Sequence, residues 1–153
     1  MPEKRERPDL LQLARDALRL ARELERGLDG ALGPDVPFGG QEYLLLRLVQ
    51  QGHETPGELA RELNAPAANV SRALQRLEAL ELLERSVDPN DHRRALLRLT
   101  PAGEATVDYA RERVTAWLQE LFARSSDVWL LGTQRRVARL LEQVVARPEP
   151  PSA

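Results

Sequence analysis

Apolar residues recur every three or four positions along most of the chain, which is the spacing of amphipathic helices. From Pro8 to about Leu32 this spacing predicts one long helix, which Gly33-Pro34 ends. A second helix is predicted at about 41–51. The first part of the chain is therefore expected to form one long amphipathic helix and one shorter helix.

Two shorter helices are predicted next, separated by a turn of about three residues. Thr55-Pro56-Gly57-Glu58 is a complete helix start, with an N-cap, a proline at the first helical position and a glutamate three residues after the cap. This helix covers 56–63 and ends at Asn64, a residue type that tolerates the left-handed conformation. The second helix covers 66–80.

After this point the apolar period changes from three or four to two. Residues 82–87 and 95–100 are predicted as short strands. Asp88-Pro89-Asn90-Asp91 lies between them with proline at the second position of a type I turn. The two strands therefore form a β-hairpin with a charged tip.

The remaining chain is again helical. Thr100-Pro101 repeats the cap-then-proline start and opens a long helix to about Arg124. Gly132-Thr133 interrupts the pattern, and a last helix is predicted at 134–146. The Pro-rich segment 147–153 is expected to be disordered.

Composition bounds the class of protein. The chain has 153 residues, 42% hydrophobic and 30% charged, which favours a single globular domain. Cysteine is absent, so disulfides, cysteine-bound metals and thiol switches are excluded. His53 and His92 are too few and too far apart to indicate a metal site, and we expect no cofactor. No apolar run is long enough to cross a membrane, so we expect a cytoplasmic protein.

The charge balance does not favour nucleic acid as a partner, because the net charge is −2. Any DNA-binding surface must therefore arise from the arrangement of charges within one segment. The helix at 66–80 has such an arrangement. Its apolar positions share one face, and its opposite face carries small, hydrogen-bonding and basic residues without an acid: Ala68, Asn69, Ser71, Arg72, Gln75 and Arg76. Arg and Gln can bond guanine and adenine edges in the major groove.

The hairpin is a second basic segment, since His92–Arg98 contains three arginines and no acid. A short helix, a turn, a longer helix and a hairpin, in that order, form a winged helix-turn-helix. The basic part of the hairpin would reach along the duplex into the adjacent minor groove. An aspartate two residues before an arginine can hold the guanidinium extended. We therefore include Arg93 and Arg94 among the candidate DNA-binding residues, with Asp91 orienting the wing.

The segment around the hairpin resembles the wing of the MarR family of bacterial transcription regulators. The matching residues are Leu77-Glu78, Leu83-Glu84-Arg85, Asp88-Pro89-Asn90-Asp91-His92-Arg93 and Leu99-Thr100-Pro101-Ala102-Gly103. The resemblance implies that Arg93 enters the minor groove, with Asp91 as its partner. It also implies that Ser71, Arg72, Gln75 and Arg76 lie in the major groove. The family usually has glycine where this chain has Glu81.

The fold expected from these patterns is mainly α with a small β-hairpin wing. A DNA-binding lobe at 41–100 is flanked by dimerisation helices at 8–32 and 101–146. The terminal helices carry more leucine and valine than a monomer of this size can cover, so we expect a homodimer on a pseudo-palindromic operator. Similar regulators release DNA when a small aromatic or anionic effector binds. The candidate effector residues are Tyr43, Arg47, His53 and Trp117, each of which also fits a packing or surface role.

These expectations favour a DNA-binding transcription regulator, more specifically a repressor. One alternative is a winged-helix module that binds protein instead of DNA, which the even distribution of charge leaves open. A second alternative, an enzyme, has little support, because Ser71 lacks a nearby His-plus-acid pair and no paired carboxylates fall in an expected cleft.

Overall fold

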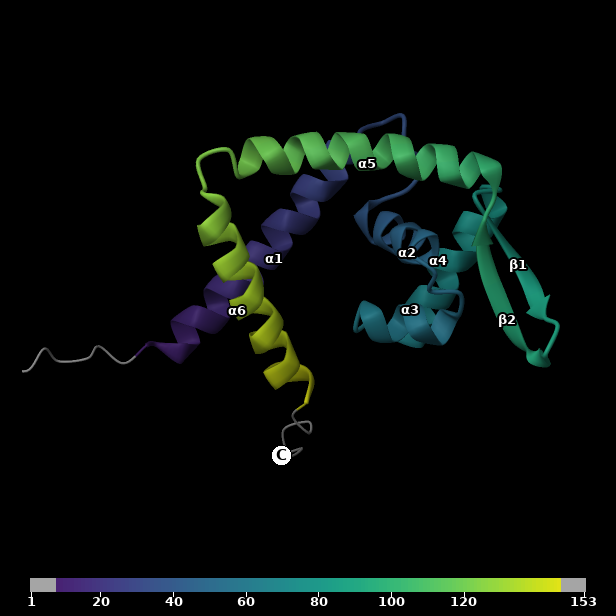
Figure 1. The fold of residues 1–153 in the computed structure, drawn as a ribbon, viewed down its shortest axis with the longest axis horizontal. Coiled ribbons are helices and arrows are strands. Elements are labelled where there is room, and N and C mark those ends of the chain that lie inside the picture. The colour runs from purple at the N-terminus through teal and green to yellow at the C-terminus, as the bar shows by residue number, and fades with distance from the viewer. Residues whose placement is uncertain (1–7, 147–153) are drawn as a thin grey trace, which may run out of the picture. The chain divides into compact units, whose positions relative to one another are not determined.

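The computed structural model describes residues 8–146, except for the side chains of residues 92–94. The described chain is mainly helical with one two-stranded antiparallel hairpin (Figure 1). Its elements are α1 (Leu10–Leu32), α2 (Gly40–Gln50), α3 (Pro56–Glu62), α4 (Ala67–Ala79), β1 (Leu83–Asp88), β2 (Asp91–Leu99), α5 (Pro101–Leu121) and α6 (Asp127–Val145). The predicted fold class is confirmed. The predicted tail at 147–153 lies outside the described residues.

The chain divides into two compact units, with the boundary between Trp117 and Leu118 inside α5. The first unit holds α1 to α4, the hairpin and most of α5. The second holds the end of α5 and α6. Among the helices at positions 8–146, none is long and apolar enough to span a membrane.

The helix starts follow the predicted capping chemistry. Asp9 caps α1, and its carboxylate accepts hydrogen bonds from the backbone N–H groups of Leu11 and Gln12 at 3.0 Å. Thr55 and Glu58 form the expected capping box at the start of α3, with their side chains and backbones paired in both directions. These bonds satisfy backbone donors that a helix start otherwise leaves unpaired.

The core of the first unit lies where α2, α3, α4 and the base of the hairpin meet. Its fully buried side chains come from the end of α1, from α2, α3 and α4, from β2 and from α5: Leu32, Leu46, Leu59, Leu74, Leu77, Leu97 and Val107. The Leu97 N–H donates to the carbonyl of Glu54 at 2.7 Å, which ties β2 to the loop before α3. This bond and the shared core position the hairpin beside the helix-turn-helix.

The hairpin differs from the expectation at its tip. β2 begins at Asp91, whereas the sequence predicts the second strand from residue 95. Asp88 pairs with Asp91 and Val87 pairs with Ala95, so residues 92–94 form an irregularity in the ladder and do not belong to an open loop. The Asn90 N–H donates to the Asp88 carboxylate at 2.8 Å, which closes a tight turn and leaves only two residues between the strands.

The last helix also differs, because α6 begins at Asp127 and not at 134. The Ser126 hydroxyl caps it by accepting the N–H of Trp129 at 3.3 Å, and the helix continues through Gly132. A glycine inside a helix lowers its stability by only about 1 kcal/mol relative to alanine. A helix with a good N-cap and flanking leucines can therefore include Gly132. Within α6, from Asp127 to Val145, all residues are at least partly exposed.

Candidate nucleic-acid interface

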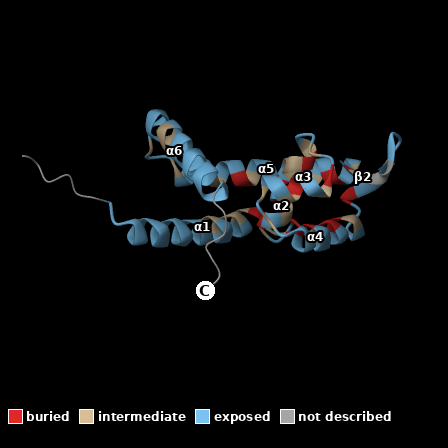
Figure 2. Cartoon of the chain, turned by 90° about the horizontal axis from the view of Figure 1, so that it is seen from below, coloured by how far each residue is buried: buried red, intermediate tan, exposed pale blue. Residues whose placement is uncertain are grey.

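Helix α4 has two chemically distinct faces, as predicted. Val70, Leu74 and Leu77 are buried, with exposed fractions of 3%, 0% and 0%. The opposite face is exposed over its whole length and includes Asn69, Ser71, Arg72, Gln75 and Arg76. Figure 2 shows the two faces of α4 as buried and exposed colours along one helix. A helix held by one face and open on the other is the arrangement that entry into a major groove requires.

Arg72 is held by its own helix. Its guanidinium Nη2 donates to Asn69 Oδ1 at 2.5 Å, one turn earlier, and both residues are exposed. Because the remaining guanidinium donors stay available, the contact orients Arg72 without neutralising its charge. The first turns of α4 thus present an oriented cation beside the hydroxyl of Ser71.

Arg76 is expected on a helix face without an acid, but in the structure it forms an ion pair. Its Nη1 lies 2.9 Å from Oε1 of Glu42, in the first turn of α2. The Glu42 side chain is 12% exposed, and its other oxygen accepts the Gly39 N–H at 3.0 Å. The exposed face of α4 carries no acidic residue of its own, as the sequence predicts. The acid that pairs with Arg76 belongs to α2.

The wing residues are placed only in part. Arg85 pairs with Glu78 at 2.8 Å, in keeping with a structural role. Asp91 is exposed and lies in β2. The side chains of Arg93 and Arg94 lie outside the described residues, so their assigned roles remain predictions.

Of the four candidate effector residues, Tyr43 and Arg47 lie one turn apart in α2. Tyr43 is buried, and burial raises the pKa of its phenol while the charges of Arg47 and Arg111 partly offset this. The Arg47 guanidinium itself donates to the side-chain oxygen of Gln50, one turn later in α2. His53 follows the end of α2, where its N–H donates to the Leu48 carbonyl at 3.0 Å.

Trp117 packs over Gly27 of α1, where an added Cβ would lie 2.2 Å from the indole Cζ2. Two open pockets border α4, and Tyr43, Arg47, His53 and Trp117 line neither of them.

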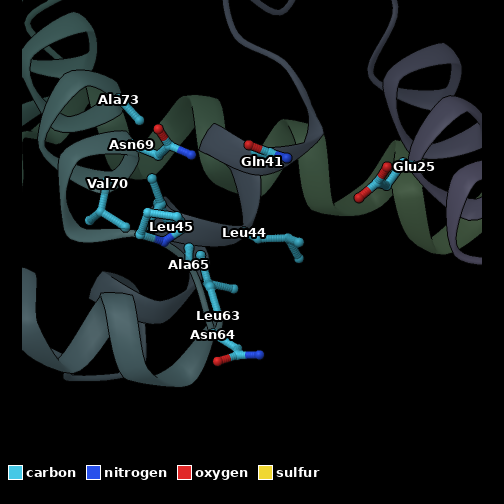
Figure 3. Close-up of a pocket in the computed structure, with 11 residues that line it drawn as sticks. Glu25, Gln41, Leu44, Leu45, Leu63, Asn64, Ala65, Asn69, Val70 and Ala73 are labelled. Carbon is cyan, nitrogen blue, oxygen red and sulfur yellow. The ribbon is translucent and has the colours of Figure 1, made fainter. Parts of the chain in front are cut away.

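One of these pockets, of about 300 Å³, lies between α1, α2 and α4. Figure 3 shows that its labelled side chains come from α1, from α2, from the turn between α3 and α4, and from α4. Leu44, Leu63 and Val70 supply apolar walls, and Glu25, Gln41 and Asn69 supply polar groups. The sequence analysis does not predict this pocket, because its residues come from four segments and none of the four carries a ligand-binding motif.

Comparison with known proteins agrees with this architecture. Residues 37–94 match the MarR family. The multiple antibiotic resistance protein MarR of Salmonella typhimurium is 30% identical over 105 residues, which cover 69% of this chain and 73% of that protein. A crystal structure of a mutant MarR from E. coli, complexed with operator DNA, matches with a TM-score of 0.78 at 24% identity. The match covers 87% of this chain and 96% of the E. coli chain.

A second structure concerns BpsR of Bordetella bronchiseptica and the regulation of its DNA binding by 6-hydroxynicotinic acid. It matches with a TM-score of 0.74 at 20% identity, over 84% of this chain and 98% of that one. Members of the matched family are transcription regulators and not enzymes. By its relation to the Salmonella protein and its winged helix-turn-helix, the chain belongs to the MarR family of transcription regulators.

Proposed function

We propose that this chain is a homodimeric repressor that binds a pseudo-palindromic operator and leaves it when a small molecule binds. The observation that carries the proposal is the exposed face of α4, which carries no acid of its own and is anchored from behind by three buried side chains. This is the geometry and chemistry of a recognition helix. Because the net charge is −2, the local arrangement of side chains on α4 is more informative than the total charge.

The contacts we propose follow from side-chain chemistry. Arg72 bonds the O6 and N7 acceptors of a guanine, and Gln75 bonds an adenine. Asn69 and Ser71 lie in the first turns of α4, where the helix N-terminus favours phosphate. In the wing, Arg93 enters the minor groove with Asp91 as its orienting partner, and Arg94 contacts the backbone.

The proposed dimer is supported by apolar surface that the chain leaves exposed. In α1, Leu10, Leu11 and Leu18 are 69%, 85% and 61% exposed. In α6 the exposed apolar residues are Val128, Trp129, Leu131, Val137, Leu140, Leu141, Val144 and Val145. Figure 2 shows the exposed colour over most of both helices. A second copy would cover this surface and would present two α4 helices to one DNA face.

The proposed effector is a small aromatic or anionic molecule. Support comes from BpsR, whose DNA binding is regulated by 6-hydroxynicotinic acid, and from the pocket between α1, α2 and α4. A ligand that contacts α1 and α4 together can favour one spacing of the recognition helices over another. It would release DNA only if it bound the released conformation more tightly. Tyr43, Arg47, His53 and Trp117 line neither pocket beside α4, so they remain candidates only for a separate effector site between the dimerisation and DNA-binding helices.

A mobility-shift experiment tests the proposal. The probe is the DNA upstream of the chain's own gene, and the competitor is a shuffled duplex of equal length. We expect specific retardation that weakens steeply with salt, and weakens further on addition of an aromatic acid such as 6-hydroxynicotinic acid. Binding of neither duplex would favour the alternative of a protein-binding module, and equal binding of both would contradict sequence-specific recognition.

A further inference from the structure

The ion pair between Arg76 and Glu42 joins the recognition helix to the start of α2. Glu42 lies at the third helical position of α2, so its carboxylate sits at the positive end of the helix and accepts the Gly39 N–H. Its side chain is 12% exposed, whereas that of Arg76 is 67% exposed. The acid is thus fixed in place by its own helix, and the arginine reaches over to it from α4.

The surroundings of the pair are acidic. Arg76 and Glu42 border an open pocket whose other charged residues are Glu25 and Asp29, both on α1. The Asp29 carboxylate accepts the Gly40 N–H at 2.6 Å, which holds this second acid beside the start of α2. The Arg76 guanidinium therefore pairs with Glu42, and two further carboxylates from α1 line the same pocket. This arrangement favours retention of Arg76 by the protein over its transfer to a DNA phosphate.

We propose that Glu42 determines the specificity of DNA binding by holding Arg76 away from the DNA. The inference rests on the proposed function, since it presupposes that α4 enters a major groove. Arg72 and Arg76 are the two basic residues of α4, and Glu42 retains one of them, so Arg72 alone is left to read bases. The ion pair of Arg76 with Glu42 then stabilises the packing of α4 against α2.

The advantage of this arrangement follows from how charges bind DNA. An arginine that reaches a phosphate strengthens binding to every sequence, because the counterions it releases carry no sequence information. An internal counter-charge on such an arginine lowers non-specific affinity and leaves base contacts intact. The ratio of operator affinity to non-specific affinity rises as a result.

The test compares Glu42→Gln, Arg76→Gln and the double variant. Glutamine at position 42 keeps an oxygen that can accept the Gly39 N–H but removes the charge. Binding to the operator and to a shuffled duplex is followed by fluorescence anisotropy between about 50 and 200 mM salt. For E42Q we expect the slope of log affinity against log salt to steepen by about 0.9 for each subunit, because one arginine per subunit becomes free to bind phosphate. The operator preference should fall.

Arg76→Gln should leave the salt slope of the wild-type chain unchanged and lower its thermal unfolding midpoint, since a largely buried carboxylate loses its counter-charge. In the E42Q/R76Q variant the E42Q effect should disappear. The double variant leaves no buried charge unpaired. It can therefore report DNA binding without Arg76 even if R76Q alone fails to fold.

Two results would overturn the inference while leaving the proposed function intact. One is a shallower slope for R76Q, which would place Arg76 on a phosphate in the wild-type complex. The other is a steeper salt slope that persists in the double variant. Glu42 would then act on DNA binding only through the net charge of the protein. Failure of the wild-type chain to bind any duplex would instead reject the proposed function, and this inference with it.

Discussion

A Cβ atom on Gly103 would lie 1.9 Å from the carbonyl oxygen of Leu82, so no side chain fits at that position. Thr100 holds the same junction together. Its hydroxyl donates to the Glu81 carbonyl at 2.7 Å and accepts the Gly103 N–H at 2.9 Å, and its N–H donates to the Leu82 carbonyl at 3.1 Å. The end of α4, the start of the hairpin and the start of α5 are therefore joined through a few backbone groups.

Gly103→Ala should destabilise the protein by about 1–3 kcal/mol or more, because the added methyl group meets backbone that cannot move aside easily. Urea unfolding monitored by circular dichroism measures the loss. Gly57→Ala is the matched control, since a Cβ there would have no atom within 4 Å, and the same substitution in α3 should be neutral or stabilising. Equal effects at positions 57 and 103 would show that the close approach to Leu82 has no energetic consequence.

Glu81 occupies a left-handed conformation with φ 57°, where an L-residue is strained and the family usually has glycine. Glu81→Gly should therefore stabilise the protein by up to about 1 kcal/mol, with the lost strain partly offset by the greater freedom of glycine in the unfolded chain. The same substitution at Glu84, inside β1, provides the comparison and should destabilise. A less stable Glu81→Gly variant would mean that the Glu81 side chain makes a contact worth more than the strain.

The sequence predicts most of this fold because its signals are local. The capping box of Thr55 and Glu58, the left-handed Asn64 (φ 47°) and the two faces of α4 follow from neighbouring residues. The predicted start of α6 is wrong because Gly132 is a weak helix breaker once Ser126 supplies a cap.

The site is less predictable, because its decisive contact is not local. Arg76 meets Glu42 only after α2 and α4 have packed together, and no spacing within either helix indicates that pair. The pocket beside α4 likewise combines residues of four segments. Packing, and not propensity, decides which arginine of α4 forms an ion pair with α2.

Arg72→Ala should weaken operator binding by about 1–3 kcal/mol and reduce the preference for operator over shuffled duplex, because it would remove the proposed bidentate base contact. Arg72→Lys keeps the charge but loses the planar fork, so it should retain the salt slope while still losing sequence preference. Competition binding at constant salt separates the two effects. If Arg72→Lys preserved the operator preference, Arg72 would be acting on phosphate and not on a base.

The stability of the first unit should fall at high pH through Tyr43. Burial raises the pKa of this phenol above its ordinary value of 10.0, so the folded state disfavours the phenolate. The unfolded chain therefore loses this proton first, and the contribution of Tyr43 is present below about pH 10 and lost as the pH rises further. Tyr43→Phe should remove that part of the decline, seen as a smaller difference in unfolding midpoint between about pH 9 and 11. If the unfolding midpoint of Tyr43→Phe fell with pH as much as that of the wild-type chain, the Tyr43 phenol would be in contact with water.

The most direct test of a dimeric major-groove reader is methylation interference on the bound operator, which reports guanines whose N7 must be free in the major groove. We predict two clusters of interfering guanines, related by the pseudo-palindrome and about 10 base pairs apart or a multiple of this, because each α4 of the proposed dimer would enter one groove. The clusters should persist in Arg93→Ala, because the proposed role of Arg93 is in the minor groove, and should weaken in Arg72→Ala. A single cluster, or binding with no interference at guanine N7, would contradict the account.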